Sequence, residues 1–203
     1  MVSTSRTIST SKDLTPSADL VLVDGDVSKK ETAIKVVDAA LKHFGRIDLL
    51  VNNAGICLPK AFTDYTEEDY NLVMNTNVAS FFYMTQQVIP QMRKQNSGHV
   101  VCISGASADQ PRGAATELLA VLSKSPLASA SKALALECAA NNIRFNTVSP
   151  AVVNTPMHTK AKSARNNEVR RCDKRLITAR PTAAGCLCLP WILPPRIFVV
   201  FEL

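Results

Sequence analysis

The sequence predicts an α/β fold in which helices cover both faces of a parallel sheet. Between residues 19 and 148, short apolar runs alternate with longer segments of helical period. The apolar runs do not alternate strictly with polar residues, which is typical of strands covered on both faces. Each run ends in polar or turn-forming residues. We therefore expect a three-layer sandwich with a ligand site at the carboxyl ends of its strands.

Strands and helices are expected in alternation along this region, and one further short strand is expected before it, at residues 2–6. The strands fall at 2–6, 20–23, 47–51, 99–103 and 143–148, and the helices at 28–44, 66–93 and 117–140. Ser28 and Glu31 have the spacing of a capping box, and Gly45 suits the end of the first helix. Thr66 can cap the second helix. Pro90 is expected to kink that helix or to end it early.

The chain has 203 residues, of which 46% are hydrophobic and 20% charged, as in an ordinary globular domain. The net charge of +6 lies entirely in residues 158–203, because residues 1–157 are neutral. We therefore expect a domain over 1–157 and an atypical tail over 158–203, basic at first and then rich in proline and cysteine. The neutral domain gives no electrostatic reason to bind nucleic acid. No element is predicted within 181–203.

The six cysteines show neither CxxC spacing nor a Cys/His cluster, so no metal site is expected. Cys57, Cys102 and Cys138 lie among apolar residues, as reduced core thiols do. The first fifteen residues are polar and do not resemble a signal peptide. The apolar run 185–201 contains three prolines and an arginine, which argues against a membrane-spanning helix. A cytoplasmic location without a membrane partner is expected.

Several motifs share the order and spacing of one known family. They are Asp26-Val27, Asn52-Asn53-Ala54-Gly55, Asn77, Ser131 to Glu137 with Ile143 to Asn146, Ser149-Pro150 and Thr155-Pro156-Met157. Over residues 2–157 the chain resembles the short-chain dehydrogenase/reductase family. The resemblance implies a Rossmann-type sandwich that uses NADP or NAD. It also implies oxidation or reduction of a hydroxyl/carbonyl pair in a small-molecule alcohol or carbonyl substrate.

The resemblance also implies roles for particular residues. Cofactor-binding positions are Arg6, Asp26, Val27, Asn53, Ala54, Gly55, Lys124 and Pro150; catalytic positions are Asn77, Ser107 and Lys124. Arg6 follows the first expected strand, where a basic residue can favour the 2′-phosphate of NADP. The position of the family's catalytic serine is ambiguous. Counted from the end of the preceding strand it falls on Gly105, and counted back thirteen residues from Ala120, the family's tyrosine position, it falls on Ser107; Ser104 is a neighbour.

Plainer interpretations stay open for several of these positions. Asn77 could be a capping residue or one that bridges backbone groups. Asn53 and Gly55 could form a simple turn, and Asp26 could cap the following helix. Lys124 and Arg6 could be solvated surface residues, and Ser107 a loop serine.

Three departures from the family pattern bear on activity. None of the seven glycines forms the glycine-rich phosphate loop, so the family's first strand, that loop and the first helix are expected to be missing. Ala120 stands four residues before Lys124, where the family has its catalytic tyrosine. After Thr159 the family pattern is lost.

Two functions therefore stay open for a truncated, divergent member. One is an NAD(P)-dependent oxidoreductase with impaired activity. The other is a non-catalytic interaction module or a non-functional truncated product. The helices at 66–93 and 117–140 match the family's dimer faces and could join two copies of the chain.

Overall fold

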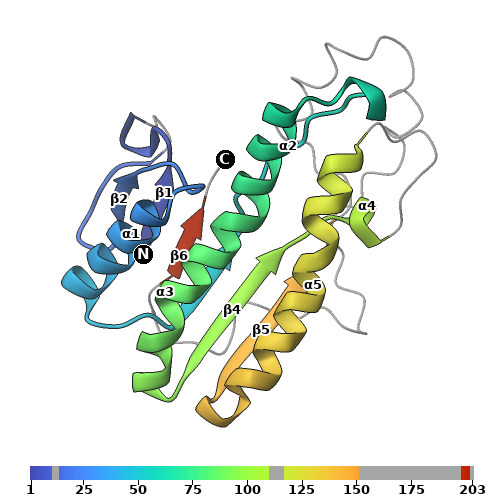
Figure 1. Cartoon of the computed structure of the whole chain (residues 1–203). Coiled ribbons are helices and arrows are strands. Elements are labelled where there is room, and N and C mark those ends of the chain that lie inside the picture. The colour runs from blue at the N-terminus through green and yellow to red at the C-terminus, as the bar shows by residue number, and fades with distance from the viewer. Residues whose placement is uncertain (11–13, 110–116, 151–197, 202–203) are drawn as a thin grey trace.

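One parallel sheet organises the molecule (Figure 1). The computed structural model describes residues 1–10, 14–109, 117–150 and 198–201. In these ranges the strand order is β2-β1-β6-β3-β4-β5, and every pairing is parallel. The strands are β1 Val2–Ser5, β2 Val21–Asp24, β3 Leu49–Asn52, β4 Gly98–Ile103, β5 Ile143–Val148 and β6 Phe198–Phe201. The predicted α/β class with a parallel sheet is confirmed.

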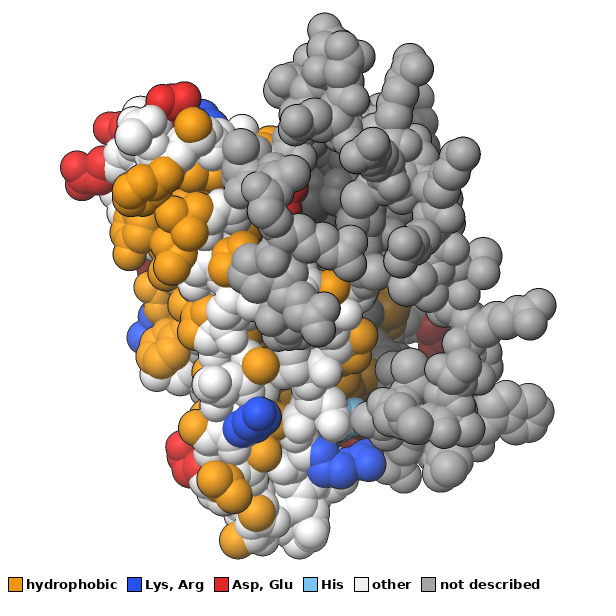
Figure 2. Space-filling model, turned by 90° about the vertical axis from the view of Figure 1, so that its right-hand side faces the viewer, with side chains coloured by type: hydrophobic (Ala, Val, Ile, Leu, Met, Phe, Trp, Pro, Cys, Tyr) orange, Lys and Arg blue, Asp and Glu red, His pale blue; other side chains and the backbone are white. Residues whose placement is uncertain are grey.

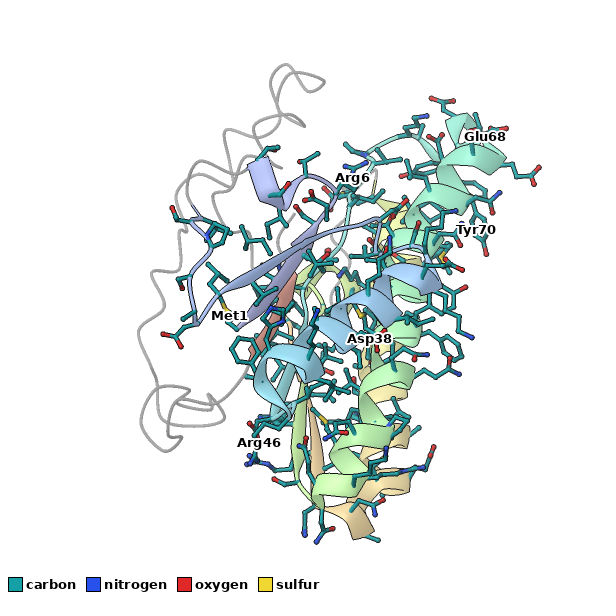
Figure 3. The ribbon with its side chains drawn as sticks, turned by 90° about the vertical axis from the view of Figure 1, so that its left-hand side faces the viewer. Met1, Arg6, Asp38, Arg46, Glu68 and Tyr70 are labelled. Carbon is teal, nitrogen blue, oxygen red and sulfur yellow. The ribbon has the colours of Figure 1, made fainter. Side chains whose placement is uncertain are left out.

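The long helices of the described ranges lie together on one face of this sheet (Figures 1 and 3). The α-helices are α1 Lys30–Phe44, α2 Glu67–Met74, α3 Ser80–Gln95, α4 Ala106–Asp109 and α5 Leu118–Cys138. Short 3₁₀ turns span Ile8–Thr10, Phe62–Asp64 and Ala139–Asn141, and a π turn spans Asn75–Ala79. The second helical layer of the expected sandwich is not contained in the described ranges.

Helix α1 ends as predicted but begins differently. Gly45 adopts φ 74° and its N–H donates to the carbonyl of Leu41, which closes the helix in the left-handed conformation that glycine favours. The predicted capping box at Ser28 is wrong, since the N-cap is Lys29 and carries no side-chain cap bond. The N–H of Ser28 instead donates to Asp26 Oδ1 at 2.9 Å. The competing local bond to the carboxylate explains the difference.

The predicted helix over 66–93 is present, but a π turn divides it. Thr66 caps α2 in a reciprocal capping box with Asp69, as predicted for its cap role. Pro90 does not end the helix early, because α3 continues to Gln95. Its inner side is buried against the sheet through Met84, Val88, Ile89 and Met92. This burial outweighs the one backbone bond that proline removes.

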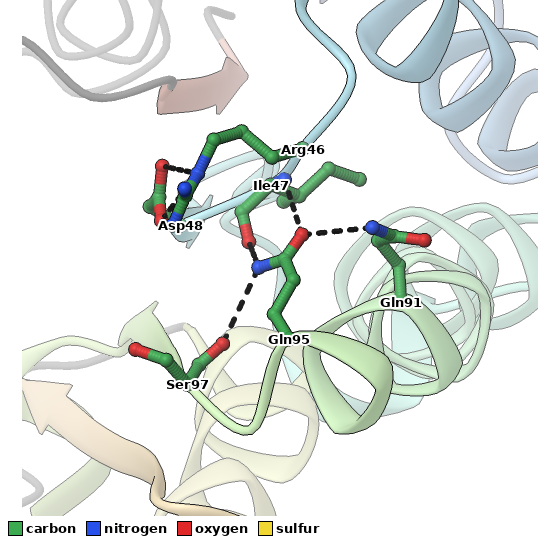
Figure 4. A network of polar contacts seen from close by, with 6 residues as sticks. All are labelled: Arg46, Ile47, Asp48, Gln91, Gln95 and Ser97. Carbon is green, nitrogen blue, oxygen red and sulfur yellow. Dashed lines mark hydrogen bonds and ion pairs between the residues drawn. The ribbon is translucent and has the colours of Figure 1, made fainter.

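A glutamine side chain fixes the end of α3 to the start of β3 (Figure 4). Gln95 Oε1 accepts from the N–H of Ile47 at 2.9 Å, and Gln95 Nε2 donates to the carbonyl of Ile47 at 2.7 Å. Gln91 donates to the same Oε1 at 2.9 Å. Ile47 is fully buried, so the amide satisfies backbone groups that would otherwise be costly to bury.

The strand β6 is the main feature that the sequence does not predict. It pairs Val199 with Val2 of β1 and with Leu50 of β3, and therefore lies in the middle of the sheet. Its residues are apolar, aromatic or β-branched, which suits a central strand. The sequence places them in a proline-rich segment, and their partners are more than a hundred residues away. The expected domain boundary at residue 157 lies outside the described residues.

Candidate active site

Lys124 is the charged group of the site, and α5 directs it toward the sheet. Its Nζ donates to the carbonyl of Ile103 at 3.0 Å and to that of Ala54 at 3.4 Å. Burial disfavours the ammonium and lowers the pKa of Lys124, while the neighbouring Cys102 thiol acts in the opposite direction. The interpretation of Lys124 as a solvated surface lysine is therefore wrong.

Asn77 lies in the π turn between α2 and α3 and is 1% exposed. Its Oδ1 accepts from the N–H of Ile56 at 2.7 Å, and its Nδ2 donates to the carbonyl of Ile56 at 3.0 Å. The same Nδ2 donates to Ser123 Oγ at 2.8 Å. Asn77 therefore joins the loop after β3 to the turn of α5 that carries Lys124. π turns are frequent at functional sites, because they redirect one side chain.

Gly55 lies between these two residues. A Cβ placed on Gly55 would be 2.7 Å from Lys124 Nζ and 3.2 Å from Asn77 Oδ1. The backbone of Gly55 is not in the left-handed region, since among the described glycines only Gly45 has positive φ. Close approach, and not turn geometry, thus accounts for the glycine. Ala54, Gly55, Asn77 and Lys124 form one compact cluster at the carboxyl end of β3.

The serines near the site differ in their hydrogen-bond partners. Ser104 is buried, and its hydroxyl donates to the backbone carbonyl of Lys124 at 3.1 Å. Ser107 lies on α4, and among the described residues no hydrogen bond joins it to Lys124 or Asn77. Ser123, which the sequence interpretation missed, receives the bond from Asn77 and donates to the carbonyl of Ala120. Its adjacency to Lys124 is the sequence signal that could have identified it.

The chain's three tyrosines are all described, and each is placed elsewhere than one turn before Lys124. The Tyr65 hydroxyl donates to the carbonyl of Leu58 at 2.6 Å. Tyr70 is half exposed on α2, and Tyr83 packs against the main hydrophobic core. The residue one helical turn before Lys124 is Ala120, whose methyl side chain cannot transfer a proton.

A second group of residues lies at the ends of β1 and β2. Arg6 is exposed just after β1, and Figure 3 shows it and Met1 at opposite ends of that strand. Burial opposes ionisation of Asp26, but hydrogen bonds from Ser28 and the charges of Lys29 and Arg6 together lower its pKa. The Asp26 carboxylate is therefore engaged in the turn before α1, but it does not cap that helix, whose N-cap is Lys29.

The remaining expected positions lie at the same edge of the sheet. Asn53 is half-buried directly after β3, and Val27 packs partly against the core. Pro150 follows β5, and its carbonyl accepts from the N–H of Ala106 at 2.9 Å. Because parallel strands end at a common edge, these residues share one rim with the cluster around Lys124. The rim thus has a cationic end near β3 and an Arg–Asp end near β1 and β2.

Neither a metal cluster nor a membrane-spanning helix accompanies the site in the described part of the chain. In residues 1–10, 14–109, 117–150 and 198–201, no three His, Cys, Asp or Glu side chains gather as a metal ion would require. Over the same ranges, no helix combines the length and the apolar character needed to cross a bilayer.

The parallel sheet and the rim at its carboxyl edge define an α/β protein of the Rossmann-like class. A family model described as "Enoyl-(Acyl carrier protein) reductase" matches residues 3–190. The chain belongs to the short-chain dehydrogenase/reductase family.

Among known proteins, the chain is similar to the 3-oxoacyl-(acyl-carrier-protein) reductase FabG of Thermotoga maritima. The two are 36% identical over 135 residues, covering 66% of this chain and 54% of FabG. The chain spans about half the length of the curated relatives it matches.

Solved structures agree in fold. A 3-ketoacyl-(acyl-carrier-protein) reductase from Brucella melitensis, complexed with NADH, has a TM-score of 0.66 and 30% identity. That alignment covers 69% of this chain and 59% of the other. A tyrosine-to-phenylalanine variant of ElxO with NADPH bound has a TM-score of 0.68 and 26% identity, over 76% and 62% of the two chains.

Proposed function

We propose that the rim binds a nicotinamide dinucleotide, with NADP(H) preferred, and that the chain is an NAD(P)-dependent oxidoreductase acting on a hydroxyl/carbonyl pair. The observation that carries the proposal is the cluster in which the Lys124 ammonium, the Asn77 amide and the Gly55 backbone meet. Relatives solved with NADH and NADPH support the cofactor class. A cytoplasmic location is part of the same proposal.

The residues at the two ends of the rim fit such a cofactor. An ammonium has three donors, and Lys124 uses two of them on carbonyls. Within the described part of the chain the ammonium has no further hydrogen-bond partner, so a third N–H can meet a ribose hydroxyl. The exposed Arg6 can meet a phosphate with its planar guanidinium. The described residues include no glycine-rich cradle for the pyrophosphate, so none of them is assigned to that group.

The roles of this chain's residues follow from their contacts. The bound cofactor would supply or accept the hydride. Lys124 would hold the ribose end, and Asn77 would keep the Ile56 backbone and the α5 turn in place as a wall of the site. The methyl group of Ala120 offers no proton to a substrate oxygen. Loss of a positioned general acid costs about 10²–10⁴-fold in rate, so turnover is expected to be slow.

The alternative is a non-catalytic relative that acts through a partner, and Ala120 is the observation that favours it. The proposed partner is a second copy of the chain. Large apolar side chains are exposed on α2, α3 and α5, namely Leu72, Phe82, Leu122 and Leu136. Figure 2 shows hydrophobic side chains gathered on one face of the molecule. Exposed apolar side chains that gather on one face of a protein are typical of interaction sites.

Cofactor titration tests the proposal. We expect NADPH to raise the melting temperature of the chain, because a ligand at 100 times its Kd adds about 2.7 kcal/mol to the free energy of unfolding. NADH should give a smaller shift. Lys124→Met should abolish the shift, whereas Lys132→Met, which removes an exposed lysine from the same helix, should keep it. The absence of any shift in the unmodified chain at millimolar NADPH and NADH would refute cofactor binding.

A further inference from the structure

The centre of the sheet contains a slot that a C-terminal strand fills. β1 and β3 each pair with β6 and not with one another. Neighbouring strands lie about 4.8 Å apart. β1 and β3 therefore lie about 10 Å apart, a separation that leaves room for one strand between them. We propose that β6 completes the sheet as a strand that the same chain inserts between β1 and β3. In this position it holds the two halves of the rim in register.

Burial explains why the slot requires an occupant. Val2 and Thr4 of β1 and Leu50 of β3 are fully buried beside it. Without β6, the facing backbone N–H and C=O groups of both strands would lie unpaired inside the core. Unpaired buried backbone groups are costly, and exposed strand edges promote aggregation.

The register shows a specific fit on both sides of β6. Toward β1, Val199, Val200 and Phe201 pair with Val2, Ser3 and Thr4. Toward β3, Phe198, Val199 and Val200 pair with Leu49, Leu50 and Val51. β6 is thus hydrogen-bonded along both edges, as a central strand is, although it lies at the opposite end of the chain from β1.

β6 lies between the two groups of residues that make up the candidate site. The β1–β2 side carries Arg6 and Asp26, and the β3–β5 side carries Gly55 and, through α5, Lys124. β6 is the strand that joins these sides within the sheet. The helices α1 and α3 join them on one face through the shared core. Loss of β6 should therefore loosen the pairing of the strands before it unfolds the helical layer.

Val200→Pro tests the proposal in the full-length chain. Proline removes an N–H and cannot be accommodated in a central strand that is paired on both sides. By hydrogen exchange, the amides of β1 and β3 should exchange at least about tenfold faster, while the β4–β5 amides stay protected. The matched control is Leu203→Pro, which places proline beyond β6 and should leave exchange unchanged. Unaltered protection of β1 and β3 in Val200→Pro would overturn the proposal.

A peptide in trans keeps the test decisive if Val200→Pro does not fold stably. A synthetic peptide of residues 197–203 should restore protection of β1 and β3 in Val200→Pro in a saturable way, and a scrambled peptide should not. If Val200→Pro does not fold and the peptide fails to restore the protection of its β1 and β3 amides, the proposal is contradicted. In the unmodified chain, protection of β1 and β3 that appears only with dimer formation would assign the slot to a second copy and overturn the intrachain assignment. The exchange readout is independent of cofactor binding.

Discussion

At the scale of single residues, the Lys124 ammonium determines what its neighbours can be. It lies close enough to Gly55 that any side chain there would displace it, and it faces carbonyls from the loop after β3 and from β4. The Asn77 amide fixes that loop from the other side. The site is therefore sensitive to changes much smaller than the loss of a charge.

Gly55→Ala should keep the fold and lose the cofactor. The added methyl meets the end of a flexible lysine side chain, which can move, so the melting temperature should change by only a few degrees. The displaced ammonium should weaken NADPH binding at least about tenfold, measured by fluorescence titration. Gly105→Ala is the control, because its Cβ would meet only Ser107 Oγ at 3.9 Å. Equal NADPH affinity in Gly55→Ala and the unmodified chain would show that Lys124 does not hold the cofactor.

Ala120→Tyr should increase turnover. A phenol one helical turn before Lys124 would have its pKa lowered by the ammonium and could exchange a proton with substrate oxygen. We expect NADPH oxidation with a small carbonyl substrate to rise by about 10²–10⁴-fold. Ala120→Phe adds the same ring without the hydroxyl and should give no gain. A gain of equal size in both variants would rule out proton transfer as its cause.

Cys102 should make stability fall at alkaline pH. Burial raises the pKa of this thiol to about 11, although Lys124 acts against the rise. The unfolded thiol titrates near about 8.5, so the folded state holds the proton more tightly than the unfolded chain does. The resulting stability, roughly 3 kcal/mol, is fully present below about pH 8.5 and is lost as pH rises toward 11. In urea titrations at several pH values, Cys102→Val should show a shallower alkaline fall than the unmodified chain; parallel curves would contradict this account.

At the scale of helices and strands, the sequence predicts where a helix begins or ends when a single capping hydrogen bond determines that end. Thr66 caps α2 and Gly45 closes α1, and both are readable from the sequence. The capping box at Ser28 fails because the Ser28 N–H, from which Glu31 would have to accept a bond, donates to the Asp26 carboxylate. Spacing alone does not decide between these two acceptors. Pro90 fails as a helix end because the packing of α3 on the sheet decides its length.

Thr66→Ala should lower the free energy of unfolding by about 1 kcal/mol. The substitution removes the side-chain acceptor of the Asp69 N–H and breaks the capping box at the start of α2. Urea denaturation would measure the loss. Thr63→Ala, in the exposed turn before α2, should stay within about 0.5 kcal/mol of the unmodified chain. An equal loss in both variants would remove the special role of the cap.

At the scale of the whole molecule, the parallel sheet and the shared rim could be predicted because they follow from alternating local periods. The strand β6 could not, because its partners lie at the other end of the sequence and its apolar run resembles any other in a proline-rich segment. The candidate site could likewise be predicted only in part. Motif spacing places Asn77 and Lys124. The hydroxyl contact of Ser104 depends on how α5 meets the end of β4, and that of Ser123 depends on how α5 meets the π turn.

The most direct test of the central claim is the hydrogen-exchange footprint of NADPH on the unmodified chain. Binding along the rim predicts slower exchange in two separate segments at once, the end of β1 with the turn at Asp26 and the loop from Asn53 to Cys57. The helix ends on the opposite edge of the sheet, such as Gly45, should be unaffected. Protection confined to one segment, or spread over that opposite edge, would contradict a dinucleotide site on this rim.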